Sequence, residues 1–101
     1  MDAIAALADP TRRRIVERLA RGALSSGEIA GRFAISAPAI SQHLKTLRAA
    51  GLVKVRAEAQ RRIYELDPHG VDEVADWVAD IRSFWAGRLD ALERQVREEQ
   101  E

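Results

Sequence analysis

One stretch constrains the fold more than any other, the segment from Ile35 to Leu52 with the sequence ISAPAISQHLKTLRAAGL. Ser36 is a good N-cap for a helix, and Pro38 in the first turn gives up an N–H group that has no helical partner. Gly51 is a typical helix end. The predicted core-facing side consists of residues at helical spacing, namely Ala37, Ile40, Leu44 and Leu47.

The opposite face of this predicted helix is small and polar, carries no acid and centres on Gln42. A helix that faces only water usually carries Glu and Lys in pairs. Ser, Gln, Thr and Lys are instead side chains that contact base edges and phosphates in a major groove. We therefore interpret the segment as a DNA-recognition helix, with a solvated helix of a small bundle as the alternative. The candidate DNA-contacting residues on it are Ser36, Pro38, Ser41, Gln42, His43, Lys45 and Thr46.

Length and composition indicate a single globular domain over residues 1–101, with 47% hydrophobic and 32% charged residues. The chain has no cysteine, which excludes disulfides and thiolate metal sites and is compatible with a reducing cytoplasm. It has no apolar run of about 18 residues and no basic segment before its first apolar stretch. We therefore expect a cytoplasmic protein without a membrane span or signal peptide.

The net charge of zero hides an uneven distribution of charge along the chain. Residues 1–66 contain twelve Lys and Arg against six Asp and Glu, a net charge of +6, whereas residues 67–101 contain four against ten, a net charge of −6. A basic half joined to an acidic half is typical of a DNA-binding module joined to an assembly element. A chance distribution of charges is the alternative.

Two helices are predicted within the first 22 residues. Residues 3–8 form a short apolar helix that needs a larger element to pack on. Asp9 and Pro10 then begin a second helix, which ends at Gly22. Three arginines crowd its first turn, where the helix dipole disfavours cations. An external phosphate or plain solvation of the side chains would both account for this placement. The buried stripe of the second helix is Ile15, Val16 and Leu19.

A capping box, with Ser25 as N-cap and Glu28 three residues on, opens a third helix that runs to about Phe33. Residues 34 and 35 then form a tight turn before Ser36. Two helices joined by three or four residues are the helix-turn-helix arrangement. Residues 34–52 are thus the turn and the recognition helix.

Residues 53–66 predict a two-stranded hairpin, because apolar and basic residues alternate and β-branched and aromatic residues are frequent. Residues 58–62 at its tip lack the Gly or Asn that a two-residue turn prefers, so we expect a longer, mobile loop. A helix-turn-helix followed by such a wing is a winged helix. Arg61 and Arg62 would reach a minor groove or its flanking phosphates.

Residues 67–99 predict one long helix, because apolar residues from Val74 to Val96 recur at spacings of three and four and form one stripe. A domain of this size cannot cover a helix about 40 Å long, so a second copy of the chain is expected to cover part of the stripe. A helix folded back on its own domain is the alternative, and Gly87 would interrupt or bend the helix. The candidate dimer contacts are Ile4, Leu7, Val78, Ile81, Trp85, Leu89 and Leu92. The predicted fold is mainly α with a small hairpin, in the order α-α-α-α-β-β-α, dimeric through the first and last helices.

Three stretches, at residues 7–19, 36–53 and 61–68, together resemble the ArsR family of small dimeric winged-helix repressors. This likeness covers nearly the whole chain. It implies a homodimer through the first and last helices, with two recognition helices in successive major grooves of an inverted-repeat operator. The positions that usually touch DNA in the family are matched here by Pro38, Ser41, Gln42 and His43.

The chain departs from the metal-sensing pattern of that family. Arsenic and cadmium sensors place a Cys-x-Cys pair where this chain has residues 31–33, GRF. The last helix carries carboxylates, and the one cluster of His with carboxylates is His69, Asp72 and Glu73, a poor set for nickel or zinc. We expect no cofactor, with a metal-responsive sensor as the alternative. An organic effector held between the first helix and Trp77, Phe84 and Trp85 is a further hypothesis.

Catalysis is the function class that the residues support least. The chain has no Cys, no glycine-rich phosphate loop and no Ser placed as a nucleophile beside either His. We therefore expect a DNA-binding regulator that is not an enzyme and whose partners are duplex DNA and a second copy of itself. A winged helix used only for protein association is the last alternative.

Overall fold

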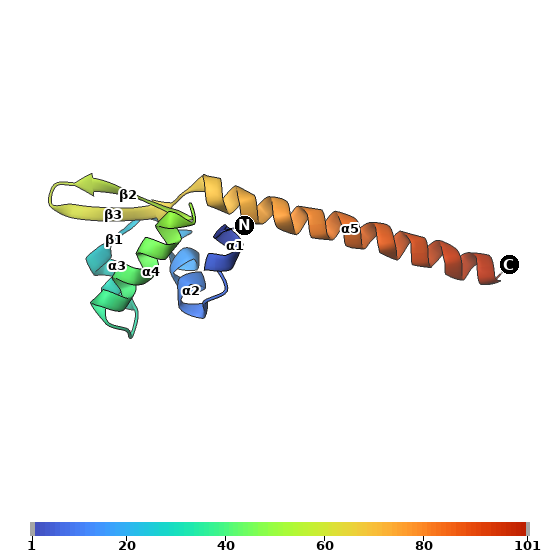
Figure 1. Ribbon diagram of the computed structural model, residues 1–101, viewed down its shortest axis with the longest axis horizontal. Coiled ribbons are helices and arrows are strands. Elements are labelled where there is room, and N and C mark those ends of the chain that lie inside the picture. Colours follow the sequence, from blue (N-terminus) through green and yellow to red (C-terminus); the bar gives the residue numbers. More distant parts are fainter. Residues whose placement is uncertain (1, 101) are drawn as a thin grey trace.

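The computed structural model describes residues 2–100, and it consists of a small domain from which one long helix projects (Figure 1). The molecule measures 72 × 25 × 22 Å along its principal axes. The elements, in chain order, are α1 (Asp2–Ala6), α2 (Pro10–Leu19), β1 (Leu24–Ser25), α3 (Ser26–Arg32), α4 (Ala37–Ala49), β2 (Val53–Glu58), β3 (Arg61–Leu66) and α5 (Pro68–Gln100).

The helix starts follow the capping residues that the sequence supplies. Asp9 Oδ2 accepts from the amide of Arg12 at 2.9 Å, which satisfies one of the orphan donors at the start of α2. At α3 the capping box is complete, because the amide of Glu28 donates to Ser25 Oγ and the amide of Ser25 donates to Glu28 Oε1, at 3.1 and 3.0 Å. Ser36 caps α4. All three predicted N-caps are confirmed.

The sheet has three antiparallel strands in the order β1-β3-β2, one more than predicted. β1 is only two residues long and pairs Leu24 with Tyr64, so it has no alternation that a sequence pattern could reveal. The expected long loop at the hairpin tip is wrong. Glu58 pairs directly with Arg61, and Ala59 adopts the positive φ of 56° that a two-residue turn requires.

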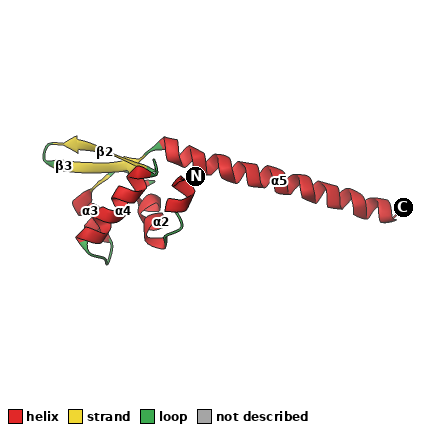
Figure 2. Ribbon diagram, viewed as in Figure 1, coloured by secondary structure: helices red, strands yellow, loops and turns green. Residues whose placement is uncertain are grey.

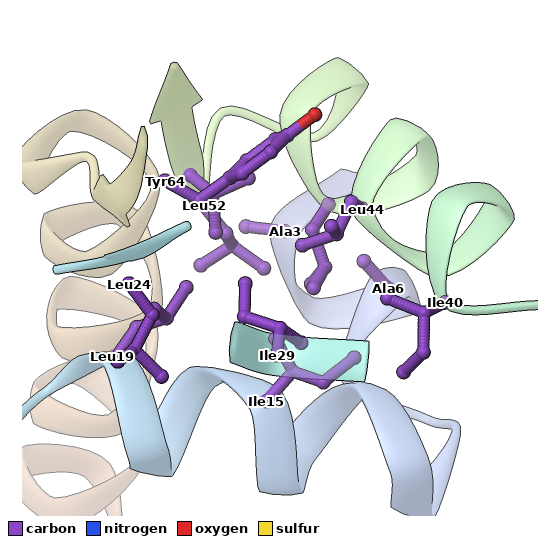
Figure 3. Packing of buried hydrophobic residues seen from close by; sticks show 12 residues of the cluster. Ala3, Ala6, Ile15, Leu19, Leu24, Ile29, Ile40, Leu44, Leu52 and Tyr64 are labelled. Atoms are coloured by element: carbon purple, nitrogen blue, oxygen red, sulfur yellow. The ribbon is translucent and has the colours of Figure 1, made fainter. Parts of the chain in front are cut away.

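The core lies where α1, α2, α3 and α4 meet the sheet (Figure 3). Leu44 and Leu47 of α4 are buried as predicted, together with Ile40. Ala37 is exposed, contrary to expectation, because it is the first residue of α4 and lies beyond the edge of the core. In α2, Ile15 and Leu19 are buried and Val16 packs against the core from its margin.

The start of α5 is joined to the end of α4 through two glycines. Gly51 takes a φ of +74° after α4, and its carbonyl accepts from the amide of Gly70 at 2.8 Å. A Cβ on Gly70 would overlap the backbone of Gly51, closer than real Cβ atoms approach. The amide of Asp67 also donates to the carbonyl of Leu52 at 2.9 Å. The long helix therefore has a defined origin at the base of the recognition helix.

Beyond its first two turns, α5 leaves the domain (Figure 2). Its side chains there are exposed. The helix runs through Gly87 without interruption, so the predicted break there is wrong. A single glycine costs a long helix only about 1 kcal/mol relative to alanine, which the turns on either side tolerate. The alternative in which the helix folds back on its own domain is also wrong. The predicted winged helix, mainly α with a small hairpin, is confirmed.

Candidate nucleic-acid interface

The exposed face of α4 presents Ser41, Gln42 and Lys45 to solvent. Pro38 is exposed beside them, in the first turn. Because Ile40, Leu44 and Leu47 hold the opposite side in the core, the helix cannot rotate to hide this face. These side chains offer an amide, a hydroxyl and a cation to a partner that fits along one helix, which is the chemistry of base and phosphate contacts.

Two predicted contact residues of α4 use their hydroxyls on the backbone. Ser36 Oγ accepts from the amide of Ala39 at 3.3 Å. Thr46 Oγ1 donates to the carbonyl of Gln42 at 3.1 Å, and Thr46 is only half-exposed. Each hydroxyl can still form another hydrogen bond, but its orientation is set by its hydrogen bond to the backbone.

His43 lies on the flank of α4 that faces the start of α2. Its Nδ1 is 4.0 Å from Asp9 Oδ2, and the His43 side chain is 21% exposed. The pKa of Asp9 lies below its usual value chiefly because its carboxylate accepts from the amide of Arg12, with His43 as a smaller cause. His43 is therefore directed at the N-cap of α2, to one side of the Gln42 face.

The two wing arginines have different surroundings. Arg61 donates from its Nη2 to Glu28 Oε1 at 2.8 Å, so it bridges the start of β3 to α3. The same carboxylate caps α3, and its pKa is lowered by the amide of Ser25 first, then by the Ser25 hydroxyl and by Arg61. Arg61 is thus already paired in the free protein, and a DNA phosphate would have to share or replace Glu28.

Arg62, the next residue, lies at a groove of about 280 Å³ between the sheet and α4. Lys45 and Arg48 of α4 line the same groove, which also contains the exposed Ser41. Sequence reasoning missed Arg48. Its spacing of three from Lys45 and seven from Ser41 places all three on one flank of the helix, which was the available signal. Three cations without an acid in this groove fit a phosphate backbone that passes from α4 to the wing.

Two of the three arginines at the start of α2 bind carbonyls of the same chain, and the third is left to solvent, as the solvation explanation expects. Arg12 donates from Nε to the carbonyl of Ala6 at 2.6 Å, and Arg13 donates from Nη1 to the carbonyl of Leu7 at 3.1 Å. One of these carbonyls belongs to the last residue of α1 and the other to the residue after it, where no further helical turn supplies a donor. The arginines therefore fasten α1 to α2, whereas Arg14 is exposed.

The weak metal candidate, His69 with Asp72 and Glu73, lies on the surface of α5 around an open depression of about 360 Å³. Among the described residues, no group of three or more His, Cys, Asp or Glu side chains is arranged to hold a metal ion. Within residues 2–100, no helix is both long and apolar enough to cross a membrane.

Known proteins resemble this chain over most of its length. A family described as a helix-turn-helix domain matches residues 7–56. The HTH-type transcriptional regulator Rv2034 of Mycobacterium tuberculosis is 50% identical over 84 residues, 83% of this chain and 76% of that protein. The solved structure of an ArsR-like transcriptional regulator from Rhodococcus sp. RHA1 superposes with a TM-score of 0.77 at 31% identity, over 92% of this chain and 88% of that one. The chain belongs to the ArsR family.

A further relative is named as a transcriptional repressor. The transcriptional repressor SdpR of Bacillus subtilis is 36% identical over 76 residues, 75% of this chain and 84% of that protein. The matched helix-turn-helix residues contain α2, α3 and α4 in full. This ArsR-family protein is accordingly a DNA-binding transcriptional regulator, and the metal-responsive alternative is not favoured over that function.

Proposed function

We propose that this protein is a homodimeric repressor that binds an inverted-repeat operator, with one α4 helix from each copy in successive major grooves. The exposed apolar stripe of α5 is the observation that carries the proposal. Eight large hydrophobic side chains of this helix are at least two-fifths exposed in the single chain, and they are Trp77, Val78, Ile81, Phe84, Trp85, Leu89, Leu92 and Val96.

A continuous apolar stripe of this length needs a partner in water. A second copy satisfies it without any further component, because a two-fold axis lets one stripe cover itself. Ile4 of α1 and Leu7, the residue after α1, are partly buried, and α1 contacts α5, so these two residues extend the proposed contact to the first helix.

The dimer would orient two reading faces, the exposed faces of α4 that carry Ser41, Gln42 and Lys45, toward one duplex. The two glycines at residues 51 and 70 tie α5 to α4, so pairing the long helices also sets the separation of the two α4 helices. A separation of about 34–36 Å corresponds to one turn of B-DNA. In this proposal Gln42 and Ser41 read base edges, while Lys45, Arg48 and Arg62 contact phosphates.

Repression follows when such a dimer covers promoter DNA, and relatives named as repressors support this direction. The test is fluorescence anisotropy with the DNA upstream of the protein's own gene and with a scrambled duplex of equal length, each at two salt concentrations. Gln42→Ala should erode the preference for the upstream DNA by about 1–3 kcal/mol. Gln95→Ala, the same change near the end of α5, is the control and should leave the preference intact. Equal binding of both duplexes by the wild type would contradict the proposal.

A further inference from the structure

A pocket of about 480 Å³ lies between α1, the start of α2 and the outer flank of α4. The hollow is open to solvent, and its volume reaches the range of about 300–1,000 Å³ that small-molecule sites occupy. It contains Gln42 and Lys45, two of the residues proposed to contact DNA. A ligand held here would therefore touch the reading face itself.

The hollow exists because two helices face each other with alanines. Ala5 and Ala6 of α1 are opposite Ala49, the last residue of α4, and its C-cap Ala50, and side chains of this size leave a space that leucines would fill. Apolar methyl groups therefore form much of the wall. Such a wall favours a ligand with a compact apolar body.

Two of the three charged residues at this pocket are cations. Arg12 is fixed at its edge because its Nε donates to the carbonyl of Ala6 at 2.6 Å, and Lys45 adds a second positive charge. Asp2 contributes one carboxylate, so the local balance is one net positive charge. This balance favours a monoanion over a polyanion such as a nucleotide.

The α1 residues that line the pocket lie apart from those proposed for the dimer contact. At about 100° per residue, Asp2 and Ala5 lie on the side of α1 opposite Leu7, which belongs to the proposed dimer contact. Occupation of the pocket and pairing of two copies thus use different faces of the same short helix.

We infer that this pocket binds a small organic monocarboxylate with an apolar body, and that binding there excludes operator DNA. The inference deepens the proposed function and rests on it for the exclusion of DNA. Because Gln42 and Lys45 would contact either the carboxylate or the duplex, the two ligands compete, and each weakens the apparent affinity of the other. This site is separate from the aromatic residues of α5, whose side chains lie on open surface.

The test uses the full chain with naphthalene-1-carboxylate as probe and naphthalene-1-carboxamide as its neutral match, measured by isothermal titration calorimetry and by amide shifts in NMR spectra. The carboxylate should bind at least about tenfold more tightly than the carboxamide, which corresponds to about one strong charge-assisted contact. The largest shifts should fall in α1 and on the flank of α4 at Ala49.

Two variants with matched controls locate the probe. Ala5→Leu fills the pocket and should abolish binding, whereas Ala8→Leu, the same change at an exposed position outside it, should not. Lys45→Met should reduce binding of the carboxylate about tenfold, and Lys54→Met on β2 should leave it unchanged. Carboxylate binding that survives Ala5→Leu, or shifts centred on the apolar stripe of α5, would overturn the inference.

Competition with DNA separates this inference from the proposed function. Upstream DNA is first titrated alone and then in the presence of saturating carboxylate, where its apparent affinity should fall at least about tenfold. Unchanged affinity overturns the inference and leaves the proposed function standing. Failure of the upstream DNA to bind at all overturns the proposed function, while calorimetry still decides whether the pocket takes the carboxylate.

Discussion

The winged domain and the projecting part of α5 both contain large apolar side chains, but the domain buries them and α5 exposes them. Leu47 of α4 is 0% exposed within the domain core, whereas Leu89, on the projecting part of α5, is 46% exposed. The domain half is basic and α5 is acidic. The domain therefore buries its apolar side chains within one chain, whereas those of α5 can be buried only by a second molecule.

The same substitution in the two regions should therefore destabilise by different routes. Leu47→Ala opens a cavity in a closed core and should lower the free energy of unfolding by about 2–5 kcal/mol, whatever the protein concentration. Leu89→Ala should cost little in the single chain and act by weakening the dimer. Urea unfolding followed by circular dichroism over a hundredfold range of concentration distinguishes the two. A loss at Leu89 that is large and independent of concentration would contradict the comparison.

The junction between the regions is tested next, at its tight glycine. Gly70→Ala forces a methyl group against the carbonyl of Gly51 and should cost about 1–3 kcal/mol, through overpacking at the base of α4. Gly87→Ala is the matched change in the projecting helix, where nothing lies within 4 Å of the new methyl group. It should raise helix stability by up to about 1 kcal/mol. Thermal unfolding of both variants checks the two signs, and equal effects would show that the junction is loose.

Within the basic region, the two wing arginines should differ in their effect on DNA binding. Arg62→Ala removes a cation from the groove shared with Lys45 and Arg48 and should weaken binding of all duplexes about tenfold, with a shallower salt dependence. Arg61→Ala should have a smaller effect, because Arg61 is paired with Glu28 in the free protein. Anisotropy titrations at two salt concentrations measure both. A larger loss of DNA binding for Arg61→Ala than for Arg62→Ala would mean that Arg61, and not Arg62, is the wing residue that contacts the duplex.

The smallest expected effect concerns the pH dependence of the α3 cap. The pKa of Glu28 in the folded state is below its usual value of 4.5, so the ionised form is the one that folding favours. Its contribution to stability is present above pH 4.5 and is lost as the pH falls through the lowered folded-state pKa. Glu28→Gln should therefore destabilise at pH 7 and matter less at pH 3. Glu17→Gln, at an exposed position of α2, is the control, and a penalty at Glu28 that does not change with pH would contradict the assigned cause.

Sequence patterns predicted the features that local chemistry determines. Caps at Asp9, Ser25 and Ser36 and the helical spacing of the core residues placed the helices correctly, because these signals involve neighbours within one turn. Sequence patterns did not predict the two-residue strand β1, because it is defined only by its pairing with β3.

The candidate site was partly predictable for the same reason. The exposed face of α4 follows from helical spacing alone, and so would Arg48. The pairing of Arg61 with Glu28 joins residues 33 positions apart in the chain, and the turn of His43 toward Asp9 depends on how α2 packs against α4. Contacts between elements of this kind carry no signature in a local pattern.

The central claim, that two basic domains are held on one duplex by a shared α5 contact, is tested most directly by the stoichiometry of the complex. Sedimentation equilibrium of the protein with a duplex that contains its upstream operator should give two chains per duplex, with Leu89→Asp unable to form that species at the same concentration. An uncompensated carboxylate in an apolar contact costs about 3–5 kcal/mol, or at least about a hundredfold in affinity. One chain per duplex, bound with full affinity by both proteins, would contradict the claim.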